Sequence, residues 1–284
     1  MTHFRVLYIG QDPDADFAPY NEQDEEYFTP RDETKSVRAD YKKYGKEYRK
    51  KGCKNSVQFA KMWLGIDTVI DKSVLSPEAF RIKEARVSGR KERYIVSNGN
   101  RLVKVVTFSN PNGNYDYYGL EHNLTKTFDY DALIKEAEEE RRKYHQSAVR
   151  VLGHIPSFKT VDDIVAELGG DAEMEHEDRI ALYQKAGDLF WEQEDVKKLY
   201  DAGIGVRDKA RTSEEDYVAG ATLPFCAIVT EEGWFEQART GWWGMSGPDT
   251  MTDKEWREVE RKAVQNALKD RDEFTEVWEC DCHI

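Results

Sequence analysis

The sequence has no long hydrophobic run and few cysteines. Nothing in its 284 residues approaches the roughly 20 consecutive apolar residues of a membrane-spanning helix, so we expect no membrane partner. The first residues have neither the basic region nor the small-residue cleavage site of a signal peptide. Four cysteines in so long a chain are too sparse for a disulfide framework. These absences predict a protein of a reducing compartment, and we expect it in the cytoplasm.

Several common catalytic motifs are also missing. The chain contains no G-x-S-x-G, G-x-x-x-x-G-K-[ST] or H-E-x-x-H and no paired C-x-x-C. Gly203 and Gly205 form a G-x-G pair, but no strand precedes them and no third glycine follows at the right spacing. The sequence therefore predicts no cofactor. It leaves catalysis undecided and favours a non-enzymatic protein.

The charge balance limits the kinds of partner. The formal net charge is -13 and the isoelectric point is about 5.1. Because the average potential repels phosphates, we expect no extended nucleic-acid surface. One explanation of such an acidic composition is ordinary solubility. The alternative is an acidic surface that contacts a partner, for example by mimicry of a nucleic acid. The oligomeric state does not follow from the sequence.

Strand patterns occupy both ends of the chain and helical patterns its middle. "HFRVLYIG" is typical of a first strand, "PFCAIVTEEGWFEQAR" of a hairpin and "EFTEVWECDCHI" of a closing strand. Asn98-Gly99, between two β-rich runs, predicts a tight hairpin turn. We expect an α+β fold, a largely antiparallel sheet of N- and C-terminal segments with the helical middle packed on it. We expect three parts. Residues 1–127 contain strands and a basic helix, residues 128–210 form a helical insertion or subdomain, and residues 211–284 form a hairpin-helix-strand unit that completes the sheet.

The segment "TKSVRADYKKYGKEYRKKG" is the one basic stretch. Its tyrosines recur at helical spacing, which predicts an amphipathic helix with a basic outer face. Such a face can contact a phosphate or an acidic partner, or it can simply be solvated. The candidate contact residues are Lys42, Lys43, Lys46, Arg49 and Lys50.

The closing strand separates its side chains into two sets, because successive residues of a strand face opposite sides. Cys280 and Cys282 share a face with Trp278 and Ile284, which predicts buried cysteines rather than metal ligands. Asp281 and His283 share the other face with Glu279. They are candidates for acid-base chemistry or for binding a divalent ion, and a solvated sheet face is the alternative.

Two aromatic segments suggest a ligand pocket. In "ARTGWWGM", Trp242 and Trp243 can stack a nucleobase, while Arg239 can bind a phosphate or carboxylate. Tyr115, Asp116 and Tyr118 of "YDYYGLEHN" would complete the pocket. Together they predict a site for a nucleotide-like small molecule. Alternatively, the tryptophan pair closes the open end of the sheet.

An acidic loop follows the first strand. Asp12, Asp14 and Asp16 alternate as in the opening of an EF-hand, but Phe17 and Gln23 stand where that loop needs Gly and Glu. A looser divalent-ion site and a set of turn-forming aspartates remain as alternatives.

The order of these segments resembles a family of uncharacterised phage-encoded accessory proteins. The resemblance is carried by "YIGQDPDADFAPYNE", "NPNGNYDYYGLEHN", "PFCAIVTEEGWFEQARTGWWGM" and the final "DCHI". "GLEHN" stands where the family pattern has a Gly-Gly-Arg-Trp-like element, so a site made by that element is in doubt here.

The resemblance implies a phage setting and a host-interaction or anti-defence role. We expect a non-enzymatic protein that binds and inhibits a host protein. The alternative is a nucleotide-like ligand-binding protein or small hydrolase that uses Arg239, Trp242 and Trp243 with Asp281 and His283.

Overall fold

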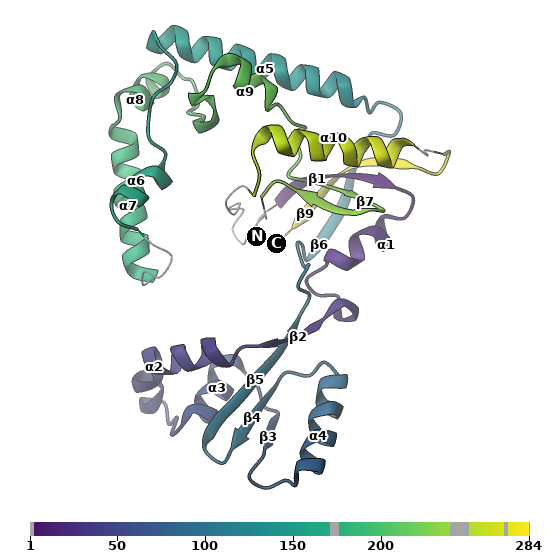
Figure 1. Cartoon of the computed structure of the whole chain (residues 1–284), viewed down its shortest axis with the longest axis vertical. Helices are drawn as coiled ribbons and strands as arrows, with labels where there is room; N and C mark the ends of the chain where they lie inside the picture. Colours follow the sequence, from purple (N-terminus) through teal and green to yellow (C-terminus); the bar gives the residue numbers. More distant parts are fainter. Residues whose placement is uncertain (1–2, 171–175, 239–249, 270–271, 284) are drawn as a thin grey trace.

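The chain folds into a larger body and a smaller lobe (Figure 1). This computed structural model describes residues 3–170, 176–238, 250–269 and 272–283, without the side chains of residues 176 and 177. The small lobe consists of residues 29–109, and the body contains the rest. The buried amide of Asn110 fastens the junction by donating to the carbonyl oxygens of Pro19 and Asn21, at 2.8 and 2.9 Å.

A five-stranded sheet forms the centre of the body. Its strand order is β6-β9-β1-β7-β8. The first strand pairs with the last in antiparallel register and with β7 in parallel register, and the remaining neighbours are antiparallel. The bounds are β1 (His3–Gly10), β6 (Tyr117–Asn123), β7 (Ala227–Thr230), β8 (Gly233–Glu236) and β9 (Glu276–His283). The predicted α+β fold, with one sheet built from both ends of the chain, is confirmed.

Each face of this sheet has its own core. On one face, Tyr8 packs with Phe17 of α1 (Pro13–Phe17), and Cys280 and Cys282 are buried here. The prediction of core cysteines is therefore confirmed. On the other face, Leu7 and Ile9 pack against α10 (Asp253–Lys269) and the start of α5 (Tyr130–Leu152).

The small lobe contains a second sheet that the sequence did not predict. Its order is β2-β5-β4-β3, and the Asn98-Gly99 hairpin joins β4 to β5, with Gly99 at a φ of 58°. The hairpin is thus confirmed, but it shares no strand with the sheet of the body. The strands are β2 (Thr29–Asp32), β3 (Val69–Asp71), β4 (Tyr94–Asn98) and β5 (Arg101–Ser109).

Helices cover both faces of the second sheet. The predicted basic helix, α2 (Thr34–Lys50), and α3 (Ser56–Leu64) pack on one face, and α4 (Pro77–Gly89) packs on the other. The tyrosines of α2 point into this core, so its lysines face outward, as the helical spacing predicted.

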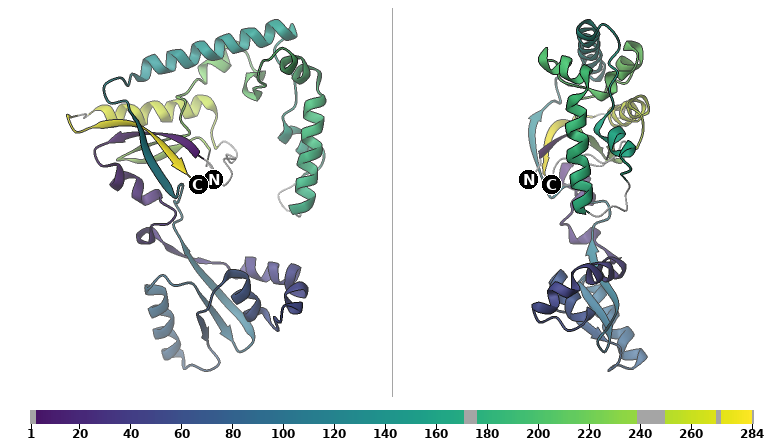
Figure 2. Two further views of the ribbon diagram at one scale, coloured as in Figure 1. Left: turned by 180° about the vertical axis from the view of Figure 1, so that it is seen from behind. Right: turned by 90° about the vertical axis from the view of Figure 1, so that its left-hand side faces the viewer.

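The helical middle runs from the body into a projecting arm. Helix α5 crosses over α10, and α6 (Val161–Glu167), α7 (His176–Glu192) and α8 (Glu194–Asp201) follow from its far end (Figures 1 and 2). We call α6, α7 and α8 the helical arm. The chain returns through a 3₁₀ turn (Asp208–Arg211) and α9 (Glu214–Ala219). None of the helices in the described ranges is both long and apolar enough to span a membrane.

Candidate functional site

Two histidines from opposite ends of the chain meet at one edge of the body. The antiparallel register of β1 and β9 pairs His3 with His283. The register of β6 and β9 places Tyr117 beside His283. Asp116, directly before β6, is held by its backbone N–H, which donates to the carbonyl oxygen of His283 at 2.9 Å. Strand pairing therefore assembles the site from three segments of the chain.

Each histidine has an aspartate at its Nδ1 atom. Nδ1 of His283 lies 2.5 Å from Oδ1 of Asp116, and Nδ1 of His3 lies 2.7 Å from Oδ2 of Asp281. The two imidazole rings meet edge to face, with centroids 5.1 Å apart. A carboxylate at Nδ1 orients the ring and leaves Nε2 as the atom that can exchange a proton. The exposed His3 pair therefore has the arrangement that general acid-base chemistry needs, whereas Nε2 of His283 is buried.

The site lies in a shallow hollow of about 500 Å³, lined by His3, Gln23, Asp116, Tyr117 and His283. The His283 side chain is 13% exposed, and its Nε2 is buried with no hydrogen-bond partner in the described part of the protein. The Tyr117 side of the hollow is open, with that residue 68% exposed. No group of three His, Cys, Asp or Glu side chains in the described segments has the geometry to hold a metal ion.

The predicted site residues fall into two structural groups. Asp116, Asp281 and His283 come together in this hollow. Tyr115 is instead 2% exposed, in the core beneath the sheet, and the Tyr118 ring stacks on Phe17 at 4.3 Å. The predicted loop residues Arg239, Trp242 and Trp243 lie outside the described residues.

The sequence interpretation missed His3 and Tyr117. A signal for His3 existed, because it begins the first strand just as His283 ends the last one. Only the pairing of those two strands, however, makes them neighbours.

The three alternating aspartates each have a different protein partner. Asp12 caps α1 by accepting from the backbone N–H of Ala15 at 3.1 Å. Asp14 accepts from the hydroxyl of Tyr118, and Asp16 accepts from that of Tyr8 at 2.9 Å. Burial raises the pKa values of Tyr8 and Asp16. These contacts fasten α1 to the aromatic core of the body.

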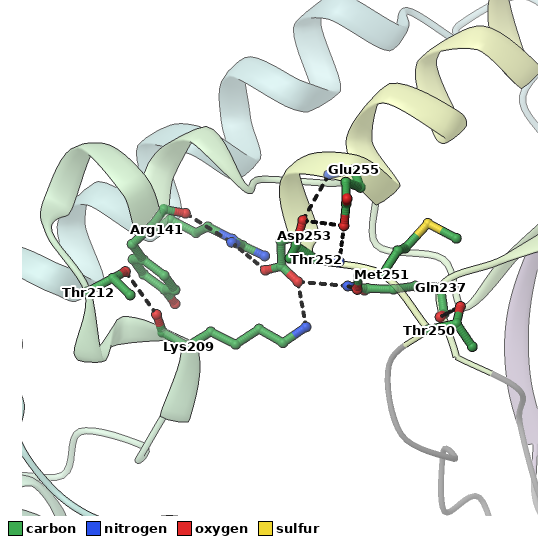
Figure 3. A network of polar contacts seen from close by, with 10 residues as sticks. Arg141, Lys209, Thr212, Gln237, Thr250, Met251, Thr252, Asp253 and Glu255 are labelled. Atoms are coloured by element: carbon green, nitrogen blue, oxygen red, sulfur yellow. Dashed lines mark hydrogen bonds and ion pairs between the residues drawn. The ribbon is translucent and has the colours of Figure 1, made fainter.

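A polar network joins α5 and the 3₁₀ turn at Asp208–Arg211 to the start of α10 (Figure 3). Asp253, at the start of α10, accepts from Arg141 of α5 at 3.0 Å, Lys209 at 2.6 Å and Gln237 at 2.9 Å. Burial alone would raise the pKa of Asp253, but these hydrogen bonds and the nearby cations outweigh it and lower the pKa. Gly220 packs against this network. A Cβ atom at that position would lie 2.7 Å from the Asp253 side chain, so no room is left for a larger residue.

Charge is divided unequally between the two parts of the chain. Residues 29–109 carry twenty Lys and Arg against nine Asp and Glu, a net charge of +11. The other residues carry 22 against 46, a net charge of -24. The predicted contact residues Lys42, Lys46, Arg49 and Lys50 are exposed on α2, as is Lys43. The small lobe is therefore strongly basic, although the net charge of the whole chain is negative.

Comparison with protein-family models, curated proteins and solved structures finds no match to this chain. Its function must therefore be argued from its own residues.

Proposed function

We propose that this protein is a phage-type accessory protein that binds and inhibits a host factor in the cytoplasm, without catalysing a reaction. The observation that supports this proposal is the row of exposed apolar side chains on the helical arm. The members of the row are Ile180 (45% exposed), Tyr183 (44%), Trp191 (51%) and Tyr200 (67%).

Several of these side chains form one continuous surface. At about 100° per residue, Ile180, Tyr183 and Trp191 lie on one face of α7. Trp191 also meets Tyr200 of α8 edge to face, with ring centroids 5.6 Å apart. Trp and Tyr are the residues that most often dominate protein–protein binding energy. An exposed cluster of them marks an interaction surface.

The surroundings of this surface suggest the charge of the partner. Residues 161–201 carry thirteen Asp and Glu against four Lys and Arg, a net charge of -9. An apolar patch with an acidic rim fits a protein surface with an apolar centre and a basic rim. The arm projects to one side of the sheet, where a partner can reach it (Figure 2).

The test compares two double variants in a bacterial host. Trp191→Ala/Tyr200→Ala removes the aromatic surface of the arm. Ile82→Ala/Phe274→Ala removes side chains that are 64% and 65% exposed elsewhere. We expect expression of the parent to inhibit the host and to co-purify one host protein in a stable ratio. Both effects should be lost in the arm variant and kept in the control. Expression without effect and a parent that purifies alone would contradict the proposal.

A second candidate function is supported by the contact of Asp116 with His283. Its hollow has an exposed ring, Tyr117, beside a carboxylate-oriented imidazole, which suits a nucleotide-like ligand or a small hydrolytic reaction. A thermal-shift screen with nucleotides and divalent ions tests it. We expect one nucleotide to raise the melting temperature of the parent but not of a Tyr117→Ala variant. No shift with any compound would refute this function.

A further inference from the structure

The outer face of α2 carries a straight row of cations. Lys35, Arg38, Lys42, Lys46 and Arg49 fall within about 80° of one another around the helix, at 100° per residue. The row extends over about 21 Å, since each residue advances the helix by about 1.5 Å. We call these five residues the basic row. We propose that it binds the phosphate backbone of a nucleic acid, independently of the function proposed for the arm.

Neighbouring carboxylates leave most of this charge uncompensated. In the described part of the chain, no carboxylate forms an ion pair with Lys35, Lys42 or Lys46. Glu47 of the same helix pairs instead with Lys51, and Glu33 before it pairs with Arg31. The contacts of Arg38 are to the carbonyl oxygens of Leu102 and Val103, which hold its guanidinium against β5 without neutralising it.

A hollow beside the basic row can accommodate part of a nucleic-acid backbone. It has a volume of about 630 Å³ and is lined by Asp32, Thr34, Lys35, Arg38, Ala39, Lys42 and Val103. Asp32 is the one acid in this lining. It already accepts from the backbone N–H and the hydroxyl of Thr34, which, with the charges of Lys104 and Arg38, lower its pKa. That carboxylate is therefore ionised and fixed in the turn into α2, where it offsets one of the three cations of the lining, Lys35, Arg38 and Lys42.

The shape of the row favours a nucleic acid over an acidic protein. Phosphates repeat at a regular short spacing along a strand, so a linear polyanion can meet every cation of a straight row. A folded acidic protein would have to present carboxylates in one matching line. The hollow also has few apolar side chains, whereas stable protein interfaces usually have an apolar centre.

The acidic body does not prevent this contact. The small lobe stands at the far end of the long axis of the molecule, away from the five-stranded sheet, and the helical arm descends toward the side of the lobe that carries α2 (Figure 1). Charges are screened over about 8 Å at physiological ionic strength. Beyond that distance from the arm, a strand bound along α2 meets mainly the potential of the lobe, whose net charge is +11. The average of -13 describes the whole chain and not this surface.

Fluorescence anisotropy of labelled oligonucleotides tests the inference on the full chain. The probes are a DNA duplex, a single DNA strand and a single RNA strand, titrated at several salt concentrations between about 50 and 200 mM. We expect at least one probe to bind saturably, with an affinity that falls linearly on a logarithmic salt scale. The probe that binds most tightly then identifies the form of nucleic acid.

Two charge-reversal variants locate the site. Lys42→Glu/Lys46→Glu alters the basic row, and Lys126→Glu/Lys262→Glu makes the same change in net charge at exposed positions of the body. We expect the first variant to weaken binding about tenfold or more and to reduce the salt slope by about 2, since each lysine that contacts a phosphate contributes about 1. The second should bind like the parent.

Four results would overturn the inference. They are no saturable binding of any probe, an equal loss in the two variants, an unchanged salt slope in Lys42→Glu/Lys46→Glu, and binding of polyglutamate as tight as that of the best oligonucleotide. Thermal unfolding of both variants establishes that any loss of binding is not a loss of folding. This test does not involve the helical arm. A negative result would therefore leave the proposed binding of a host factor intact, and failure of the host-factor proposal would leave the proposed nucleic-acid binding intact.

Discussion

His283 and Asp116 lie 167 positions apart in the chain, yet Nδ1 of one is 2.5 Å from Oδ1 of the other. The contact unites the "YDYY" segment with the final "DCHI". It forms because β6 and β9 pair antiparallel and bring both residues to the same edge of the sheet. A side-chain contact at the meeting point of two distant segments makes this edge the first place to test by mutation.

Removal of the Asp116 carboxylate should destabilise the protein. In an Asp116→Ala variant, Nδ1 of the mostly buried His283 loses its partner, and we expect a loss of about 1–3 kcal/mol in the free energy of unfolding. Urea denaturation followed by tryptophan fluorescence measures it. Glu121→Ala, at an exposed position of β6, is the control and should change the stability by less than about 0.5 kcal/mol. Equal stability of the two variants would mean that the contact is absent in solution.

Glu260 should make the stability fall as the pH rises. Its side chain is 1% exposed and accepts from the backbone N–H of Leu223 at 3.0 Å and from the hydroxyl of Tyr130 at 3.3 Å. Burial outweighs these hydrogen bonds and raises the pKa of Glu260 from 4.5 to about 7. The folded state therefore binds this proton more tightly than the unfolded state. The resulting stabilisation is complete below about pH 4.5 and is lost as the pH rises through about 7.

A Glu260→Gln variant isolates this effect. Between about pH 5 and pH 8, we expect the parent to lose about 2–3 kcal/mol more stability than the variant, since one pKa unit corresponds to about 1.4 kcal/mol. Glu258→Gln, on the exposed side of α10, should follow the parent curve. Parallel curves for the parent and Glu260→Gln would show that Glu260 does not titrate in this range.

Loss of Asp253 should loosen the attachment of α5 and α9 to the body. An Asp253→Ala variant leaves Arg141, whose side chain is 18% exposed, without its carboxylate, and we expect a cost of about 2–3 kcal/mol. Because the pKa of Asp253 is lowered in the folded state, its contribution is present above about pH 4 and is lost on further acidification. Chemical denaturation gives the cost, and limited proteolysis should cut the variant faster in the helical middle.

Asp216→Ala provides the comparison for Asp253. It removes an ion pair with Lys254 in which both side chains are 56% exposed, and a hydrogen bond from the Ser213 hydroxyl, so it should cost clearly less stability than Asp253→Ala. If both variants lose the same amount of stability, the network around Asp253 does not have the predicted role.

Thiol labelling should distinguish one cysteine from the other three. Cys226 is exposed, whereas Cys53, Cys280 and Cys282 are buried. Burial raises the pKa of Cys280 to about 12 and raises that of Cys282 as well. Partial burial also raises the pKa of Cys226, so it is the exposure of Cys226 that distinguishes it from the other three. At about pH 8, a disulfide reagent should titrate one thiol in the folded protein and four after denaturation. Fast reaction of a Cys226→Ser variant would contradict the buried positions.

Local patterns predicted many elements correctly. Alternation in "WECDCHI" identified Cys280 and Cys282 as core residues, and the spacing of the tyrosines in 34–51 identified a helix with its lysines outward. Asn98-Gly99 marked the hairpin, which the structure contains. Helix α4 was not predicted, although Ser76 caps it and Pro77 begins it. Such signals depend on a few neighbouring residues, whose sterics and hydrogen bonds act over one or two turns.

Only the tertiary structure decided which elements meet. The sequence by itself determined the closing strand, the Asn98-Gly99 hairpin and the basic helix, the burial of Cys280 and Cys282, and how acidic the chain is. It did not determine that the hairpin belongs to a second sheet, that His3 lies beside His283, or that residues 29–109 concentrate the positive charge in one lobe. The physical reason is that strand pairing and charge proximity depend on contacts between residues far apart in the chain. Composition averages over such contacts, and local periodicity does not reach them.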